Sequence, residues 1–268
     1  MKLRINRLWP LLGMLPLFGC AAALDSALDT AGRTAGARVG GAAGRYVGDR
    51  IVRHYTPQFT RLYASYMFSY AFTPGGYWVE TNDYEPGDWT RWRFTENGET
   101  DGSWLERAFL RRLEDGREWW RVAMYDADSD DTVTLEALFD ADRSSILRLR
   151  SQFPGQDIGE MPVGEGTPVY SEPLTLTAES LEGATVGTQT VQVPAGRFTA
   201  RHVRFTDVAG VGRAEWWLVD TVPGGIVKYS TSHPHDTDED AVEGLSEYNW
   251  TLELTETGSD ATTQLGSY

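Results

Sequence analysis

The sequence predicts a mainly β protein of the α+β class, in which a large antiparallel sheet forms an open half-barrel after a long N-terminal helix. Three observations lead to this prediction. Apolar and polar residues alternate in many short segments after about residue 66, and turn-forming Pro and Gly residues separate those segments. An Ala- and Arg-rich stretch without proline precedes them. We therefore expect about nine to eleven strands in one sheet.

Residues 1–19 are predicted to be a lipoprotein signal peptide. A basic start is followed by the apolar segment Leu8–Phe18, which is shorter than the roughly 20 residues needed to span a bilayer. The motif Leu17-Phe18-Gly19-Cys20 is similar to a bacterial lipobox. We therefore expect diacylglycerol on the thiol of Cys20 and an acyl chain, such as palmitate, on its new amino group. An ordinary cleaved signal beside a chance cysteine is the alternative.

The predicted lipid on Cys20 places the protein at a membrane. Several buried acyl chains, at about 0.8 kcal/mol per methylene, hold a protein durably where one chain does not. Cys20 is the only cysteine, so lipidation gives it a role that disulfide pairing cannot. Ala21 follows it, and by resemblance to Gram-negative lipoproteins this favours the outer membrane. We expect the body to face the periplasm, with the cell surface as the alternative.

Residues 20–62 are predicted to hold the lipidated cysteine and a glycine-spaced helix over about 22–53. Glycine recurs at every fourth position, although each one costs a helix about 1 kcal/mol relative to alanine. This seam consists of Gly32, Gly36, Gly40, Gly44 and Gly48. We interpret it as a surface that another backbone approaches closely, either the protein's own sheet or a helical partner. A helix at the membrane surface and a flexible tether are the alternatives.

Residues 63–257 are predicted to form the antiparallel β domain, and residues 258–268 a flexible polar tail. Residues 172–184 are expected to hold a short helix or an irregular crossing. The neighbouring pairs Trp119-Trp120 and Trp216-Trp217 place indoles on both faces of their strands. Both faces are therefore expected to be covered, unless one indole of each pair lies at a half-exposed rim.

The charge of the chain is uneven. Its formal net charge is −15. Residues 20–62 carry a net +3 and residues 63–268 a net −21. The basic arm suits anionic lipid headgroups, and the acidic body should repel nucleic acid, so we exclude nucleic acid as a partner. Salt adaptation and an acidic binding surface both remain explanations of the acidity.

Part of the C-terminal half resembles a known group of proteins. Val193-Pro194-Ala195-Gly196-Arg197-Phe198, then Glu215-Trp216-Trp217-Leu218, then Val222-Pro223-Gly224-Gly225-Ile226-Val227-Lys228-Tyr229 are similar to hairpins of bacterial periplasmic families with the LolA/LolB fold. The resemblance covers about residues 185–256. It implies a half-barrel wrapped around helices, with an apolar cavity that holds acyl chains in the carriers.

We find no pattern that predicts an enzyme, a cofactor or a metal. The acidic segment Asp126–Asp131 lacks the Gly and Glu that a calcium loop of the EF-hand type needs at its sixth and twelfth positions. The segment His233–Asp240 is interpreted as a solvated loop rather than a metal site. His54 and His202 have no motif for a nucleophile near them. We therefore expect no catalytic residues.

Two functional hypotheses follow, and a hydrolase whose site has no recognisable motif is a third option. In the first, the envelope lipoprotein binds a lipid, an acyl chain or a lipidated peptide in its open barrel. The predicted lining consists of Trp92, Trp120, Trp216, Tyr248, Trp250 and Leu252. In the second, the protein is a non-enzymatic scaffold subunit of an outer-membrane or envelope complex, and its glycine seam binds a helical protein partner. A helix lodged on the concave side of the sheet would favour the second.

Overall fold

A computed structural model of the chain describes residues 57–74, 77–79, 82–96, 98–163, 169–170, 174–208, 212–234 and 247–268. All of them belong to one of the two units into which the chain divides, Tyr55–Tyr268. Cys20, the helix predicted over 22–53 and the glycine seam lie outside the described residues.

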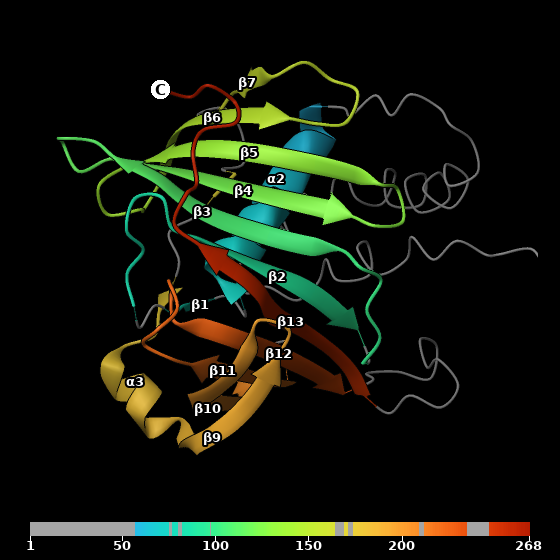
Figure 1. Cartoon of the computed structure of the whole chain (residues 1–268), viewed down its shortest axis with the longest axis vertical. Helices are drawn as coiled ribbons and strands as arrows, with labels where there is room; N and C mark the ends of the chain where they lie inside the picture. Colours follow the sequence, from blue (N-terminus) through green and yellow to red (C-terminus); the bar gives the residue numbers. More distant parts are fainter. Residues whose placement is uncertain are drawn as a thin grey trace, which may run out of the picture. The chain divides into compact units, whose positions relative to one another are not determined.

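Eleven strands form one antiparallel sheet that stays open, as the sequence predicted, in the spatial order β7-β6-β5-β4-β3-β2-β13-β12-β11-β10-β9 (Figure 1). The strands are β2 (Trp89–Glu96), β3 (Trp104–Arg112), β4 (Glu118–Asp126), β5 (Asp131–Phe139), β6 (Ile146–Gln152), β7 (Gly159–Met161), β9 (Thr185–Val193), β10 (Gly196–Val208), β11 (Gly212–Leu218), β12 (Ile226–Pro234) and β13 (Glu247–Gly258). A separate parallel pair joins β1 (Tyr77–Trp78) to β8 (Leu174–Thr175).

The sheet consists of two runs of sequential strands that the last strand joins. β2 to β7 pair in chain order, and so do β9 to β13. β13 then pairs with β2, with Leu252 opposite Phe94 and Trp250 opposite Glu96. The pairing of β13 with β2 therefore connects the two halves of the sheet.

Most apolar residues that predicted the strands are buried, although β3, β4 and β5 are buried on both faces and their burial does not alternate. Leu135, Trp216, Tyr229 and Leu252 all lie buried on their strands. Leu147 is the exception, because it is 43% exposed while Ile146 and Leu149 are buried. The pairing of β5 with β6 shifts register between Leu138 and Phe139, which turns Ile146 inward.

Helix α2 (Pro57–Phe72) replaces the start of the strand region predicted from about residue 66. Proline suits the first turn of a helix, where its missing N–H is not needed. The buried residues recur at helical rather than strand spacing. They are Ala64, Met67, Phe68, Tyr70, Ala71 and Phe72. The predicted boundary between residues 62 and 63 falls inside α2.

The second described helix, α3 (Ala178–Gly183), agrees with the short helix expected within 172–184. The hydroxyl of Thr177 caps it by accepting a hydrogen bond from the backbone N–H of Ser180. Neither α2 nor α3 combines the length and the apolar character that a membrane crossing requires.

Residues 259–268, here called the C-terminal strap, cross the face of β3 to β6 that lies opposite α2 (Figure 1). These residues were predicted to be a flexible polar tail. Leu265 is 2% exposed and Ser267 is also buried. The backbone N–H of Ala261 donates to the carbonyl of Gly87, which fixes the start of the strap beside β2. The strap adds a covering layer that its polar composition does not indicate.

Candidate functional site

The predicted cavity residues gather on the face of the sheet that α2 covers. Trp92, Trp120, Trp216, Trp250 and Leu252 are all buried. The predicted lining residue Tyr248 lies in β13, and its side chain is outside the described part of the structure. The sequence therefore placed five of these side chains in the interior, and what fills that interior decides their role.

Aromatic side chains of α2 fill the space against several of these residues. The ring of Phe72 meets Trp120 edge-on, with centroids 5.3 Å apart, and Tyr70 lies 4.7 Å from Trp250. Near the start of the helix, the hydroxyl of Tyr63 donates to the sulfur of Met124 at 3.3 Å. Trp120 also stacks on Phe109 at 4.6 Å. The concave side therefore holds a packed aromatic core in which the helix occupies the position expected for a ligand.

A small crevice remains where the end of α2 meets β2, β3, β12 and β13. The space inside it that can hold the centre of a water-sized molecule is about 10 Å³, which is roughly the room for one water. Pockets for drug-sized ligands usually hold about 300–1,000 Å³. The lining residues are almost all apolar: Tyr70, Ala71, Pro74, Trp92, Arg107, Ile226, Tyr229 and Leu252. The crevice as it stands is therefore smaller than an acyl chain of ordinary length requires.

Two phenols at this crevice are held neutral by burial. Burial raises the pKa of Tyr70 to about 12 and the pKa of Tyr229 well above its usual value. The hydroxyl of Tyr229 is buried and makes no hydrogen bond within the described structure. An unsatisfied buried hydroxyl costs about 1–3 kcal/mol. A small polar guest that formed a hydrogen bond with the hydroxyl of Tyr229 would remove this cost.

The buried guanidinium of Arg107 lies beside the crevice in a cage of aromatic rings. It stands 4.5 Å from the ring of Tyr84 and 5.2 Å from that of Phe72. Its Nε donates to the hydroxyl of Tyr84 at 3.1 Å. Aromatic faces attract a cation most strongly when water is excluded, which helps to offset its loss of hydration. Arg107 therefore acts as part of the packing on this side.

Gly224, the first glycine of the Pro223-Gly224-Gly225 motif, lies against this cage. Gly224 has a φ of +74°, and a Cβ there would lie 2.3 Å from an Nη of Arg107 and 2.6 Å from Tyr84. Its backbone N–H donates to the carbonyl of Asn82 at 2.8 Å. Glycine is favoured at this position both by the left-handed backbone and by the close approach of two side chains.

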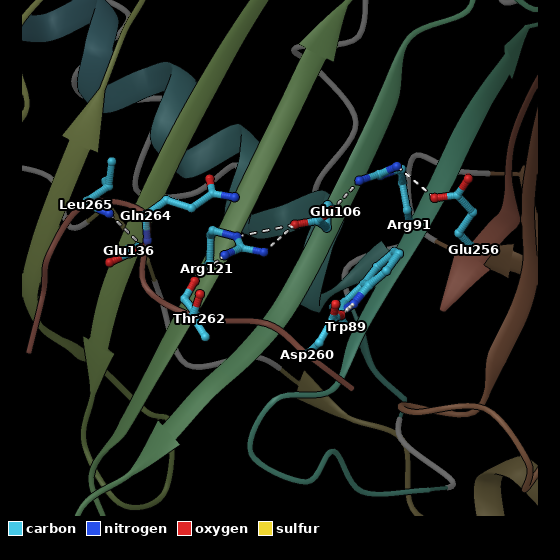
Figure 2. Close-up of polar contacts among 10 residues, drawn as sticks. All are labelled: Trp89, Arg91, Glu106, Arg121, Glu136, Glu256, Asp260, Thr262, Gln264 and Leu265. Carbon is cyan, nitrogen blue, oxygen red and sulfur yellow. Dashed lines mark hydrogen bonds and ion pairs between the residues drawn. The ribbon is translucent and has the colours of Figure 1, made fainter. Parts of the chain in front are cut away.

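The opposite face of the sheet carries a row of ion pairs that runs from β13 toward the strap. Arg121 donates to Glu106 at 2.8 Å, and Arg91 bridges Glu106 to Glu256 at 2.8 Å on each side (Figure 2). Arg121 and Glu106 are both buried. Burying charges is costly unless they are paired in good geometry. The strap contributes to that geometry, because Arg121 also donates to the carbonyl of Thr262.

Glu136 of β5 anchors the strap. Its carboxylate accepts hydrogen bonds from the backbone N–H of Gln264 at 2.6 Å and of Leu265 at 3.2 Å (Figure 2). The hydroxyls of Thr263 and Ser267 donate to the same carboxylate. Glu136 is fully buried. Four donors thus replace the water that this carboxylate loses, and all four come from the strap.

The two tryptophan pairs are covered differently. Trp120 packs under α2, and Trp119 lies in an apolar cluster with Ala108, Leu110 and Leu138 that Ala261 of the strap helps to cover. In the second pair Trp216 is buried, whereas Trp217 is half-buried. The first pair is therefore covered on both faces, and the second has one indole at a rim.

Trp217 forms a small surface arrangement with its neighbours. The imidazole of His202 stacks on it at 4.7 Å, and the ammonium of Lys228 lies 5.4 Å from its ring. His202 in turn bonds to Glu215 at 3.0 Å. His202 is therefore held by packing against Trp217 and by its hydrogen bond with Glu215.

The acidic segment forms the hairpin turn between β4 and β5. The carboxylate of Asp126 accepts hydrogen bonds from the backbone N–H of Asp128 and the hydroxyl of Ser129. The described residues contain no group of three His, Cys, Asp or Glu side chains placed to hold a metal ion. The segment His233–Asp240 lies outside the described side chains.

Sequence reasoning missed both the helical cover and the strap. The apolar spacing of Ala64, Met67, Phe68 and Ala71 is the signal that could have revealed α2. For the strap, the available signal was Glu136, an acidic residue inside the apolar run Val133–Phe139. A buried carboxylate requires donors, but the sequence does not indicate which segment provides them.

Comparison with known proteins gives little further information. No protein-family model and no curated protein matches the chain. Among solved structures, the chain is similar to a protein of Parabacteroides distasonis ATCC 8503 that is described, provisionally, as a lipoprotein. The two are 10% identical, over 67% of this chain and 99% of that one, with a TM-score of 0.33. So distant a likeness identifies neither a fold family nor a function, and the resemblance to the LolA/LolB families stays a prediction.

Proposed function

We propose that the protein is a lipid-anchored envelope lipoprotein that acts as a non-enzymatic interaction platform. The observation that carries this proposal is that the chain itself occupies both faces of β3 to β5. Aromatic residues of α2 fill one face, and the strap is bonded to Glu136 on the other. This packing supports a rigid body whose remaining surfaces meet other molecules, with the lipid on Cys20 fixing the body at the membrane.

The anchor is tested by metabolic labelling with an alkyne analogue of palmitate in a Gram-negative host. The full-length chain should take up label and sediment with the outer membrane. Cys20→Ser is the matched control and should lose both properties while keeping the same circular dichroism spectrum. A chain that carries no label and fractionates away from membranes would remove the anchor from the proposal.

The platform is tested at the glycine seam, which lies outside the described residues. Photo-crosslinking from a site near Gly40 should give a discrete complex at the membrane. Gly40→Leu with Gly44→Leu should abolish the complex, because leucine prevents close approach of another backbone. Gly40→Ala with Gly44→Ala is the milder control and should weaken it less. Unchanged crosslinking in the leucine variant would argue against the seam as a docking surface.

Binding of a hydrophobic ligand is the second candidate function, favoured by the apolar crevice and by the unbonded hydroxyl of Tyr229. A guest longer than the crevice would require α2 to move. Organic extraction and mass spectrometry of the purified full-length chain would reveal a bound lipid. Trp92→Ala should then change the amount recovered, with Trp217→Ala as a control outside the crevice. Extracts that hold only the anchor's own acyl chains would favour the platform alone.

A further inference from the structure

The two edges of the sheet differ in how they are protected against further pairing. β7 forms one edge and has only three residues, Gly159–Met161, whose Glu160 is held by Arg148 at 2.9 Å. β9 forms the other edge with nine residues, Thr185–Val193. Proteins usually guard an edge with short strands, charges, prolines or bulges, as β7 illustrates. β9 therefore calls for a separate explanation.

β9 carries little of this protection. It contains no charged residue and no proline, in a chain with 24% charged residues. β10 pairs with one side of it, from Gly196 opposite Val193 to Val203 opposite Thr185. No strand pairs with its other side among the described residues, although β13 approaches the end of β9, where Val193 is buried and the backbone N–H of Ala195 donates to the carbonyl of Leu254 at 3.0 Å. A register shift opposite Gly187 disturbs the other end, which leaves Thr188–Gln192 as a regular edge.

The edge is also accessible. Residues 186–190 and residue 192 are exposed, and the side chain of Val186 is 55% exposed. β-branched and polar residues such as Thr188, Thr190 and Val191 favour the extended backbone that strand pairing needs. A row of backbone groups on such a strand is a template for another strand.

The charges beside the edge indicate the kind of strand it would accept. Arg201 and Arg197 of β10 lie opposite Thr188 and Gln192 of β9. Because they are four residues apart on one strand, they lie on the same face of the sheet. Neither forms an ion pair with a described residue, although the body carries a net −21. A strand added to β9 would lie about 9–10 Å from β10, within reach of an extended arginine side chain.

We propose that β9 binds an extended, acidic segment of a partner protein as a twelfth strand of the sheet. Backbone hydrogen bonds to Thr188–Gln192 would supply the pairing, and Arg197 and Arg201 would select carboxylates on the added strand. This inference rests on the proposed function, because it names the class of partner that the platform receives. A second copy of the chain fits less well, since each copy has a net charge of −15 and β9 would bring like arginines together.

The binding test uses the purified full-length chain and a short fluorescent peptide of alternating Val and Glu. Two control peptides accompany it: one alternates Val and Lys, and the other has Val and Glu with alternate backbone nitrogens methylated. The acidic peptide should bind, and the methylated copy should not, because it cannot donate to the edge. Hydrogen exchange should show new protection confined to Thr188–Gln192.

Variants separate the edge from general charge. Arg197→Gln with Arg201→Gln should weaken binding of the acidic peptide about fivefold, the loss expected for two exposed ion pairs. Arg117→Gln with Arg148→Gln changes the net charge equally, at one arginine of the turn between β3 and β4 and one of β6, and should leave binding within about twofold. Thr190→Pro tests the backbone edge, and an unchanged circular dichroism spectrum would show that it still folds.

Three results would overturn the proposal: equal binding of the methylated peptide, protection elsewhere than β9, or a dimer formed through β9 that excludes the peptide. Each leaves the anchor and the glycine seam untouched, since those tests use Cys20, Gly40 and Gly44. Conversely, loss of the anchor would leave the peptide result standing. Failure of this inference and failure of the proposed function are therefore distinguishable.

Discussion

Two regions of one sheet are stabilised in different ways. Around β3 to β5, α2 covers one face and the strap the other, so that both Trp119 and Trp120 are buried. Around β10 and β11, Trp216 is buried but Trp217 lies at a half-exposed rim. The first region is therefore buried on both faces, while the second has a partly exposed face and, among the described residues, an edge strand without a neighbour. The comparison shows that similar sequence pairs obtain different burial from different covering segments.

The largest expected effect concerns the covered region. Trp120→Ala should lower the free energy of unfolding by about 3–5 kcal/mol, because it empties a fully buried site against Phe72 and Phe109. Trp217→Ala removes the same side chain from the rim and should cost about 1 kcal/mol. Urea denaturation of both variants measures the difference. Equal losses in the free energy of unfolding would show that the two regions do not differ in stability in this way.

The next effect tests the strap. Glu136→Ala should cost about 3 kcal/mol, because it leaves four strap donors without their acceptor. Hydrogen exchange at the amides of Gln264 and Leu265 should accelerate, while the amides of β12 keep their protection. Glu160→Ala, which removes an exposed carboxylate, is the control and should change little. A strap that remains protected without Glu136 would show that apolar contacts hold it.

A smaller effect is expected at the turn beside the aromatic cage. Gly224→Ala should cost about 2–3 kcal/mol, because a left-handed residue gains a Cβ that meets Arg107 and Tyr84. Gly155→Ala is a matched control with a φ of +70° and no atom within 4 Å of the added Cβ. It should cost about 1 kcal/mol from backbone strain alone. Thermal unfolding of both variants measures the difference between them, which is the cost of the steric overlap at Gly224. Equal shifts in Tm would show that the overlap costs nothing.

The smallest effect concerns Glu253, on the face of β13 that the strap leaves uncovered. Burial raises the pKa of Glu253, but hydrogen bonds from Arg93 and Lys228 outweigh it, so the net pKa lies below its usual value. A lowered folded pKa contributes stability above the unfolded pKa of about 4.3, and that stability is lost as pH falls through the folded value.

Glu253→Gln should therefore cost up to about 1 kcal/mol at neutral pH and almost nothing in acid. Urea denaturation between neutral and acidic pH, at low and high salt, measures this loss. Salt should reduce it further, since the pair is partly exposed. A loss of stability that grows as the pH falls would contradict a lowered pKa of Glu253.

Much of the sheet could be predicted because strand patterns are local. The alternation in Val133–Phe139 and in Tyr248–Leu254 marks a buried face directly, and the Asp115-Gly116 turn marks a hairpin. The pairing of β13 with β2 could not be predicted, since the two strands are far apart in the chain. Hydrophobic pattern specifies which face is buried but not which strand becomes the neighbour.

The candidate site was predictable only in part. The sequence placed Trp92, Trp120 and Trp250 in the interior, and burial agrees. It could not show that Phe72 and Tyr70 would occupy the space beside them, because a cavity and a packed core need the same apolar lining. The open edge at β9 was equally hidden, since an edge is defined by the absence of a neighbour, which is a property of the whole sheet.

The sequence by itself determined the class of the fold, the acidic body and the residues that face inward, because alternation, turns and charge are properties of neighbouring residues. The tertiary structure alone decided that α2 fills the concave side, that the last ten residues cover the other face, and that β9 has a side to which no described strand pairs. Those outcomes depend on which distant segments meet. A helix and a polar strap reach their places only through contacts such as Phe72 with Trp120 and Gln264 with Glu136, which no local pattern encodes.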